Sequence, residues 1–239
     1  MDPGGTGKTR SRYAPGDILD FSFNKYQQEV LRLKRPLLIV WEVTHACDMS
    51  CRHCGVDAGR PLEDELTTAE ALRVIDELGS MGLQHLLFAG GEPLVRPDLL
   101  QLAAHGARYF SVGINTNGYR LDGPLAERLR EAGVNQVRIS LDGADAPTHD
   151  YLRREGSFAR AVAAVKHCLA QEFPEVGIQA TLSQWNYAQL PALIELAAGL
   201  GVRVFEAREF FPTGRGKEMA HLALSHAQRE EMFAYLAEM

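Results

Sequence analysis

From residue 36 onward the chain alternates between short apolar runs and longer amphipathic stretches. The apolar runs are rich in β-branched and aromatic residues and predict strands at 37–43, 85–89, 109–115, 134–141, 176–182 and 202–207. In the stretches that follow, apolar residues recur every three or four positions, which predicts helices at 67–82, 123–133, 157–171, 190–201 and 224–239. The pattern therefore predicts about six repeats of a strand followed by a helix.

Residues typical of helix ends agree with these boundaries. Thr67 is followed three positions later by Glu70, the spacing of a capping box at a helix start. Gly82, Gly133 and Gly201 stand where three of the helices should stop. The local signals and the periodicity thus predict the same elements.

Strands that alternate with helices indicate a parallel sheet with right-handed crossovers. The chain lacks a dinucleotide-binding fingerprint, which favours a partial or full α/β barrel over a doubly wound sheet. In both architectures the chemistry gathers at the carboxyl ends of the strands. Candidate functional residues are therefore expected directly after strands.

We expect three parts along the chain. Residues 1–35 comprise a Gly- and Pro-rich tail and a segment that caps the bottom of the barrel or docks a partner peptide, 36–216 form the core, and 217–239 form a C-terminal helix. The tail contains GGTGKT at 4–9, but Asp2 occupies the position where a phosphate-binding loop needs its first glycine. We therefore do not expect a nucleotide site there.

Composition excludes several classes of protein. The 239 residues are 46% hydrophobic and 23% charged, which is typical of a globular chain rather than a disordered or fibrous one. The net charge of −6 gives no basic field for a nucleic acid or an anionic membrane. The sequence has neither a secretory signal nor an apolar run of about 18 residues, so we expect a cytoplasmic protein without a membrane span.

Three of the four cysteines lie close together after the first predicted strand. Cys47, Cys51 and Cys54 form a C-x3-C-x2-C loop, and thiolates at this spacing favour zinc or an iron–sulfur cluster. A zinc site would take His45 or His53 as its fourth ligand. Three cysteines without a fourth would instead leave one iron of a [4Fe–4S] cluster open to a substrate. The remaining cysteine, Cys168, has apolar helical neighbours and is expected in the core.

Polar or glycine residues also follow the next three strands. The second strand ends in Gly90, Gly91 and Glu92, which would let a ligand approach the backbone closely and meet a carboxylate. Asn115 and Ser140 lie at the ends of the third and fourth strands. An ordinary turn explains the neighbouring Asn-Gly and Asp-Gly pairs equally well.

Taken together, these motifs resemble those of the radical S-adenosylmethionine (SAM) superfamily. The resemblance covers about residues 36–215. It implies a partial (β/α)6 TIM-like barrel in which the three cysteines bind a [4Fe–4S] cluster. It also implies that SAM is bound by His53, Gly90, Gly91, Glu92, Asn115, Ser140 and Arg153. Among these, Glu92 and its two glycines would hold the amino group, Ser140 the ribose, and Arg153 the carboxylate. His53 replaces the aromatic residue that commonly packs on the adenine.

The resemblance implies an oxidoreductase that cleaves SAM reductively to methionine and a 5′-deoxyadenosyl radical. The radical would abstract hydrogen from a substrate, which we expect to be a peptide or protein side chain. Maturation of a tetrapyrrole or metal cofactor is the alternative, and a non-catalytic zinc-stabilised scaffold is a remote one. The electron would come from a low-potential donor of the flavodoxin or ferredoxin type.

The segment FFPTGRG at 210–216 resembles members that carry a C-terminal SPASM domain. Such a domain needs many cysteines, and none follows Cys168, so we expect either that it lies beyond Met239 or that one cluster suffices. Glu206 and Arg208 share a face of the last strand. They are expected to line the cavity, to form a buried ion pair, or to face solvent at the strand edge.

Overall fold

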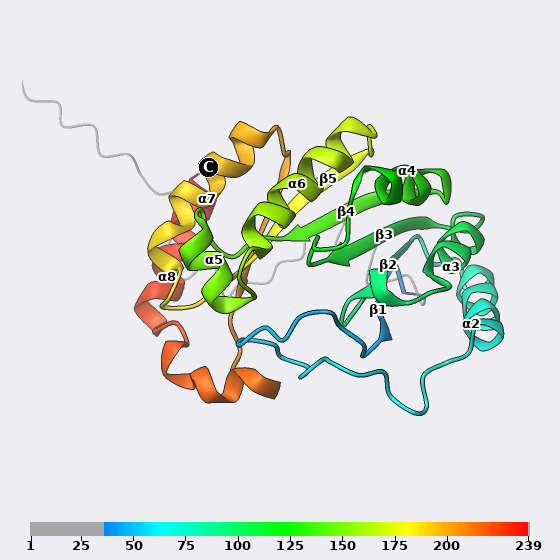
Figure 1. Ribbon diagram of the computed structural model, residues 1–239, viewed down its shortest axis with the longest axis horizontal. Coiled ribbons are helices and arrows are strands. Elements are labelled where there is room, and N and C mark those ends of the chain that lie inside the picture. The colour runs from blue at the N-terminus through cyan, green and yellow to red at the C-terminus, as the bar shows by residue number, and fades with distance from the viewer. Residues whose placement is uncertain (1–35, 239) are drawn as a thin grey trace, which may run out of the picture. The chain divides into compact units, whose positions relative to one another are not determined.

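The computed structural model describes residues 36–238, and the expectations for residues 1–35 lie outside this range. Six parallel strands form one sheet in chain order, so that β1 and β6 are its edges (Figure 1). The strands are β1 (Leu38–Thr44), β2 (His85–Gly90), β3 (Ser111–Thr116), β4 (Val134–Ser140), β5 (Glu175–Leu182) and β6 (Val204–Glu209). This arrangement confirms the predicted partial barrel.

Helices connect successive strands and follow the last one. They are α2 (Thr68–Ser80), α3 (Leu99–Gly106), α4 (Gly123–Glu131), α5 (Ala146–Leu152), α6 (Ser157–Ala170), α7 (Leu190–Leu200) and α8 (His226–Ala237). Short 3-10 turns are η1 (Pro93–Val95), η2 (Tyr187–Gln189) and η3 (Gly214–Leu222). No helix within residues 36–238 is long and apolar enough to cross a membrane.

The predicted helix ends are confirmed. Thr67 and Glu70 form the reciprocal capping box of α2, with Glu70 accepting a hydrogen bond of 2.9 Å from the Thr67 backbone N–H. Gly82, Gly133 and Gly201 all have positive φ angles after their helices. Two helices were not predicted, because α3 and α5 have only eight and seven residues, too few to show a helical period.

The two faces of the sheet differ in polarity. Side chains alternate along a strand, and one face of β2 to β5 carries fully buried apolar residues that pack with residues of the helices, including Leu86, Phe88, Ile114, Ile139 and Ile178. The opposite face carries polar residues such as Asn115, Arg138 and Gln179, which are only partly buried. The polar face therefore remains available to line a site.

Candidate functional site

A cavity of about 390 Å³ lies at the carboxyl ends of the strands and is lined by all three clustered cysteines. Cys47, Cys51 and Cys54 are free thiols on the long connection between β1 and α2. Cys47 N–H donates to the Gly59 carbonyl at 3.0 Å, which joins the start of this loop to its end. The connection therefore forms a wall of the cavity, and we call residues 45–59 the cysteine loop.

Two side chains brace the cysteine loop from outside. The Glu65 carboxylate accepts hydrogen bonds from Thr44 Oγ1 at 2.9 Å and His45 N at 2.7 Å. Desolvation opposes its ionisation, but these and other hydrogen bonds hold the pKa of Glu65 below its usual value. The His45 ring contacts the backbone carbonyls of Val56 and Arg60 at 2.9 and 3.1 Å. His45 is therefore a bracing residue and not the zinc ligand considered above.

Gly90 and Gly91 bring the end of β2 directly against the cysteine loop. Gly91 N–H donates to the Thr44 carbonyl and Glu92 N–H to the Ala46 carbonyl, both at 2.8 Å. A Cβ atom on Gly91 would lie 2.2 Å from the Ala46 oxygen, and one on Gly90 would lie 2.3 Å from the Thr44 oxygen. No side chain fits at either position, which explains why two glycines stand here.

Glu92 places a buried carboxyl group at the cavity, with an exposed fraction of 1%. It accepts hydrogen bonds from Thr116 Oγ1 and Asn117 N at 2.7 Å and from Leu94 N at 3.1 Å. These neutral donors favour the ionised form, but burial outweighs them and raises the pKa of Glu92 to about 7. A positively charged ligand group beside it would favour ionisation.

Asp142, after β4, is a second buried carboxylate, with an exposed fraction of 0%. It forms ion pairs with Arg153 and with His53 Nε2, the latter at 3.2 Å, and accepts a hydrogen bond from Thr181 N at 2.8 Å. Burial would raise its pKa, but Arg153 and His53 more than compensate and hold the pKa of Asp142 well below its usual range. From the sequence, an ordinary turn explained this position as well as a functional role did.

Through Asp142, the end of β4 is connected to both α5 and the cysteine loop. Arg153, at the end of α5, lines the cavity, and Asp142 raises its pKa although burial opposes this. His53 also lines the cavity and contacts the Leu152 carbonyl through Nδ1 at 3.3 Å. The structure therefore brings these two predicted site residues together around Asp142.

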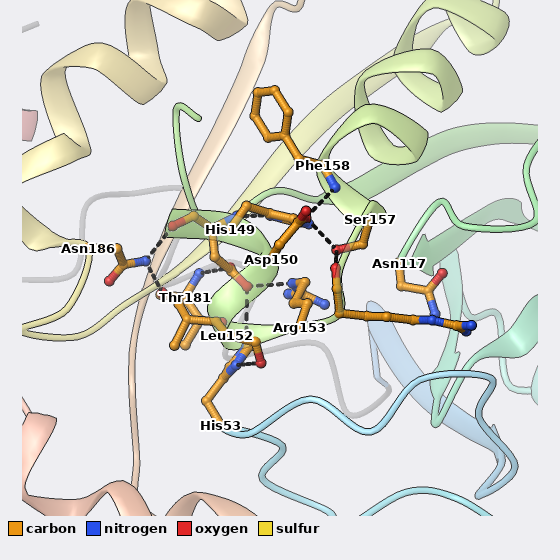
Figure 2. Close-up of polar contacts among 12 residues, drawn as sticks. His53, Asn117, His149, Asp150, Leu152, Arg153, Ser157, Phe158, Thr181 and Asn186 are labelled. Atoms are coloured by element: carbon orange, nitrogen blue, oxygen red, sulfur yellow. Dashed lines mark hydrogen bonds and ion pairs between the residues drawn. The ribbon is translucent and has the colours of Figure 1, made fainter. Parts of the chain in front are cut away.

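His149 lies behind this network and is fully buried. The Asp142 backbone N–H donates to His149 Nδ1 at 3.0 Å, so this nitrogen is unprotonated. Burial and the nearby Arg153 lower the pKa of His149 to about 4. Asn186 Nδ2 donates to the Asp142 carbonyl at 2.7 Å and completes the support of this turn (Figure 2).

Asn115 and Ser140 both line the cavity, as their places at the ends of β3 and β4 predicted. Asn115 Oδ1 is buried and has no hydrogen-bond partner among the described residues. A buried acceptor without a donor is costly, so this oxygen indicates a place for a ligand hydroxyl or N–H group.

The thiols fit a multi-iron cluster better than a single zinc ion. Zinc with thiolate ligands needs sulfur atoms about 4 Å apart around one point. Within residues 36–238, no three His, Cys, Asp or Glu side chains are arranged to hold one metal ion. Cluster thiolates bind separate irons and need not converge on one point. Burial raises the pKa of Cys47 to about 11, so a cationic metal centre would be needed to keep it ionised.

The segment after β6 also supports the cysteine loop, and the sequence did not predict this support. Arg215 Nε donates to the Cys51 carbonyl at 3.1 Å and Nη1 to the Ala58 carbonyl at 2.8 Å. A Cβ atom on Gly214 would lie 2.6 Å from the Cys54 carbonyl oxygen. The sequence signal for this contact was a glycine next to an arginine after a strand. The partners of that arginine lie about 160 positions earlier, so the signal did not reveal them.

Glu206 and Arg208 pair with each other at 3.4 Å, but this ion pair is only partly buried. Glu206 accepts hydrogen bonds from Arg138 Nε at 2.6 Å and Gln179 Nε2 at 3.1 Å, so it belongs to a polar network inside the barrel. Arg208 lines the cavity. Cys168 is fully buried, and burial raises its pKa to about 12, which fits its expected place in the core.

The open parallel barrel, with three thiols and a Gly-Gly-Glu turn at its carboxyl end, is the arrangement of enzymes that cleave SAM with an iron–sulfur cluster. A family profile described as the radical SAM superfamily matches residues 41–197. The chain therefore belongs to the radical SAM superfamily, a class of enzymes that use a [4Fe–4S] cluster and SAM.

Among curated relatives, the AdoMet-dependent heme synthase of Methanosarcina barkeri is 38% identical over 85% of this chain and 58% of its own length. The mycofactocin maturase MftC of Mycobacterium tuberculosis is 36% identical over 85% of this chain and 52% of its own. The chain thus spans about half the length of the curated relatives it matches. Streptococcus suis SuiB bound to S-adenosylmethionine has the same fold, with a TM-score of 0.70 at 17% identity over 90% of this chain and 51% of its own.

Replacing Asp142 with Asn is expected to lower the free energy of unfolding by about 3–5 kcal/mol, because it leaves the buried Arg153 charge without its partner. Asp57→Asn is the matched control, since it removes an exposed partner of Arg215 and should cost less than about 1 kcal/mol. Urea denaturation of the metal-free protein under reducing conditions measures both. Equal losses of unfolding free energy in the two variants would contradict a central role for Asp142.

The raised pKa of Glu92 predicts a pH-dependent stability. Between its usual value of 4.5 and about 7, the folded state holds a proton that the unfolded chain releases. The resulting contribution to the free energy of unfolding, on the order of 3 kcal/mol, is fully present below the pKa of the unfolded chain and is lost as the pH rises through 7. Urea denaturation of the metal-free protein from pH 5 to 8 should show this slope in the wild type but not in Glu92→Gln. If the stability of the wild type and of Glu92→Gln changed with pH in parallel, the prediction would be refuted. Glu127→Gln, an exposed change on α4, is the control and should follow the wild type.

Proposed function

We propose that Cys47, Cys51 and Cys54 hold the [4Fe–4S] cluster and that the adjoining cavity binds SAM. One observation carries this proposal: backbone hydrogen bonds join the Gly90–Glu92 turn to Thr44 and Ala46, where β1 passes into the cysteine loop at one end of the barrel. Three thiols and a buried carboxyl group therefore face a single cavity. When bound and reduced by one electron, the cluster would cleave SAM to methionine and a 5′-deoxyadenosyl radical that removes hydrogen from a substrate.

The side chains around the cavity suit the parts of SAM. Glu92 would accept the amino group, and an ammonium beside it would favour loss of the Glu92 proton to solvent. Arg153 would face the carboxylate while Asp142 fixes its orientation. Ser140 and the unpartnered Asn115 Oδ1 would bind ribose hydroxyl groups, and His53, braced by Asp142, would contact the adenine.

We further propose that residues 36–216 form the catalytic core and that 217–239 are a helical C-terminal segment of the same enzyme. A SPASM-type auxiliary-cluster domain would be consistent with the FFPTGRG segment. Because an iron with an open coordination site reacts with oxygen, the enzyme would work in a reducing cytoplasm, supplied with electrons by a flavodoxin- or ferredoxin-type protein.

For the substrate we propose a peptide or protein side chain. The inner face of β4 to β6 carries the polar residues Arg138, Gln179, Glu206 and Arg208, which offer hydrogen-bond donors and acceptors along an extended chain. The mycofactocin maturase relatives and the solved SuiB complex with precursor peptide SuiA support this class.

Tetrapyrrole maturation is the second candidate, because relatives named AdoMet-dependent heme synthase and Fe-coproporphyrin III synthase are 38% and 32% identical to this chain. A flat macrocycle would be better served by broad apolar walls than by the polar face of β4 to β6. The polar face therefore favours the peptide.

The catalytic proposal predicts that anaerobically reconstituted protein, reduced with dithionite, converts SAM to 5′-deoxyadenosine. Cys47→Ala should abolish product, because one iron loses its ligand. Cys168→Ala is the matched control, since this buried thiol lies in α6 away from the cavity lining. Liquid chromatography of 5′-deoxyadenosine, together with iron and sulfide content, measures the result. A Cys47→Ala protein with full iron and full activity would refute the assignment.

The substrate proposal predicts that a short precursor peptide encoded beside this chain's gene increases 5′-deoxyadenosine formation and changes in mass. Iron-coproporphyrin III should do neither. Arg208→Gln should weaken the peptide effect more than SAM cleavage without peptide, because Arg208 lines the cavity near the end of β6. Stimulation by the tetrapyrrole alone would favour the second candidate instead.

A further inference from the structure

The outer side of the cysteine loop carries arginine and aromatic side chains that the chemistry above does not use. Four exposed arginines gather there with three aromatic residues, and we call this set the arginine face: Arg52, Arg120, Arg154, Arg160, Tyr119, Tyr151 and Trp185. None of the seven is among the described residues that line the cavity. A molecule bound to this face would therefore not compete for the SAM cavity.

The arginine face is attached directly to the residues between the cysteines. Arg120 Nε pairs with Asp48 Oδ2 at 2.8 Å, and Arg154 Nη1 donates to the Asp48 carbonyl at 3.1 Å. Arg52 N–H donates to the Leu152 carbonyl at 2.8 Å. Asp48 adjoins Cys47 and Arg52 adjoins Cys51, so the face lies one residue from two of the proposed cluster ligands.

Aromatic rings hold the guanidinium groups in place. Arg154 and Arg160 lie over the Tyr119 ring, 4.6 and 5.5 Å from its centroid. Arg52 lies 4.5 Å from the Tyr151 centroid, and Tyr151 stacks on Trp185 at 3.9 Å. Arginine, tyrosine and tryptophan are the residues enriched where proteins bind one another, and prior ordering reduces the entropy lost on binding.

The charge of the arginine face is opposite to that of the whole chain. The protein carries a net charge of −6, whereas the face presents four arginines with Asp48 and Glu155 nearby. Asp48 is shielded, because its carboxylate is bonded to Arg120 and to Asn117. An acidic partner would be attracted to this face and repelled by much of the remaining surface, which fixes its orientation.

We propose that the arginine face is the docking surface for a small acidic protein that carries one electron. This inference rests on the proposed cluster at Cys47, Cys51 and Cys54. The reduced centre of the carrier would give up one electron and the cluster would accept it, so that the carrier is oxidised and the cluster reduced, with no proton or group transferred. An electron donor needs closeness to the cluster rather than access to the cavity, and the arginine face provides that.

The test compares two triple charge reversals in the reconstituted full chain. The first is Arg52→Glu with Arg120→Glu and Arg160→Glu. The matched control is Arg73→Glu with Arg128→Glu and Arg130→Glu, three exposed arginines on α2 and α4 outside the arginine face. Stopped-flow absorbance follows cluster reduction by a reduced acidic bacterial-type ferredoxin and, separately, by dithionite.

The face variant should be reduced by ferredoxin at least about tenfold more slowly than the wild type at low ionic strength, and the difference should shrink as salt is added. Reduction by dithionite should stay within about twofold of the wild type, since a small reductant needs no docking surface. The control variant should behave as the wild type with both reductants. The neutral triple variant, with Gln at the three face positions, should be reduced by ferredoxin at a rate between those of the wild type and the charge-reversal variant. It also tests the proposal if the charge-reversal variant does not fold.

Anisotropy of fluorescently labelled ferredoxin provides a readout that does not depend on SAM cleavage. Binding should weaken in the face variant and not in the control. If the wild type makes no 5′-deoxyadenosine with dithionite, the proposed function fails, while ferredoxin binding still tests the docking surface. Equal ferredoxin rates in the face and control variants, or a wild-type rate that does not depend on salt, would overturn the proposal.

Discussion

The site depends on the close contact between the end of β2 and the cysteine loop. The register pairs Thr44 of β1 with Gly90 of β2, and the next two N–H groups, of Gly91 and Glu92, bond at 2.8 Å to the carbonyls of Thr44 and Ala46, where β1 passes into the loop. Such close contact is possible only because Gly90 and Gly91 carry no Cβ. Because the loop is fixed by backbone atoms, the positions of its thiols follow from the sheet itself.

The two buried carboxyl groups of the site are kept in different states by their neighbours. Both are almost completely inaccessible to solvent, but Asp142 faces a guanidinium and Glu92 faces only neutral donors. The pKa of Asp142 is therefore lowered, whereas that of Glu92 is raised to about 7. Pairs of titratable groups whose environments separate their pKa values often mark distinct roles. Asp142 serves as a fixed internal charge, and Glu92 remains free to meet a cation that enters from outside.

The sequence predicted the order of strands and helices, because each element long enough to show a period has one apolar face. It also predicted that the cysteines, Glu92 and Asn115 lie around one cavity, since each lies at or soon after the carboxyl end of a strand and parallel strands bring these ends together. Asp142 was explained as a turn because its partners lie at positions 53, 153 and 181, and no local pattern shows such pairing. Arg215 was missed for the same reason, and His45 was considered as a ligand because a sequence does not show which way a ring points.

The cysteine loop separates two environments that differ in charge and in access. Its inner side carries thiols, a histidine and small residues that face the cavity, while its outer side meets arginines and tyrosines that reach it from the segments after β3 and β4. The same short segment, 151–154, contributes to both sides: Arg153 points to Asp142 and the cavity, and Tyr151 and Arg154 lie on the outer face. The end of α5 therefore couples the two environments. A change that shifts this segment would disturb the cavity and the arginine face at once, so the two are best separated by substitutions at exposed arginine side chains that leave the backbone in place.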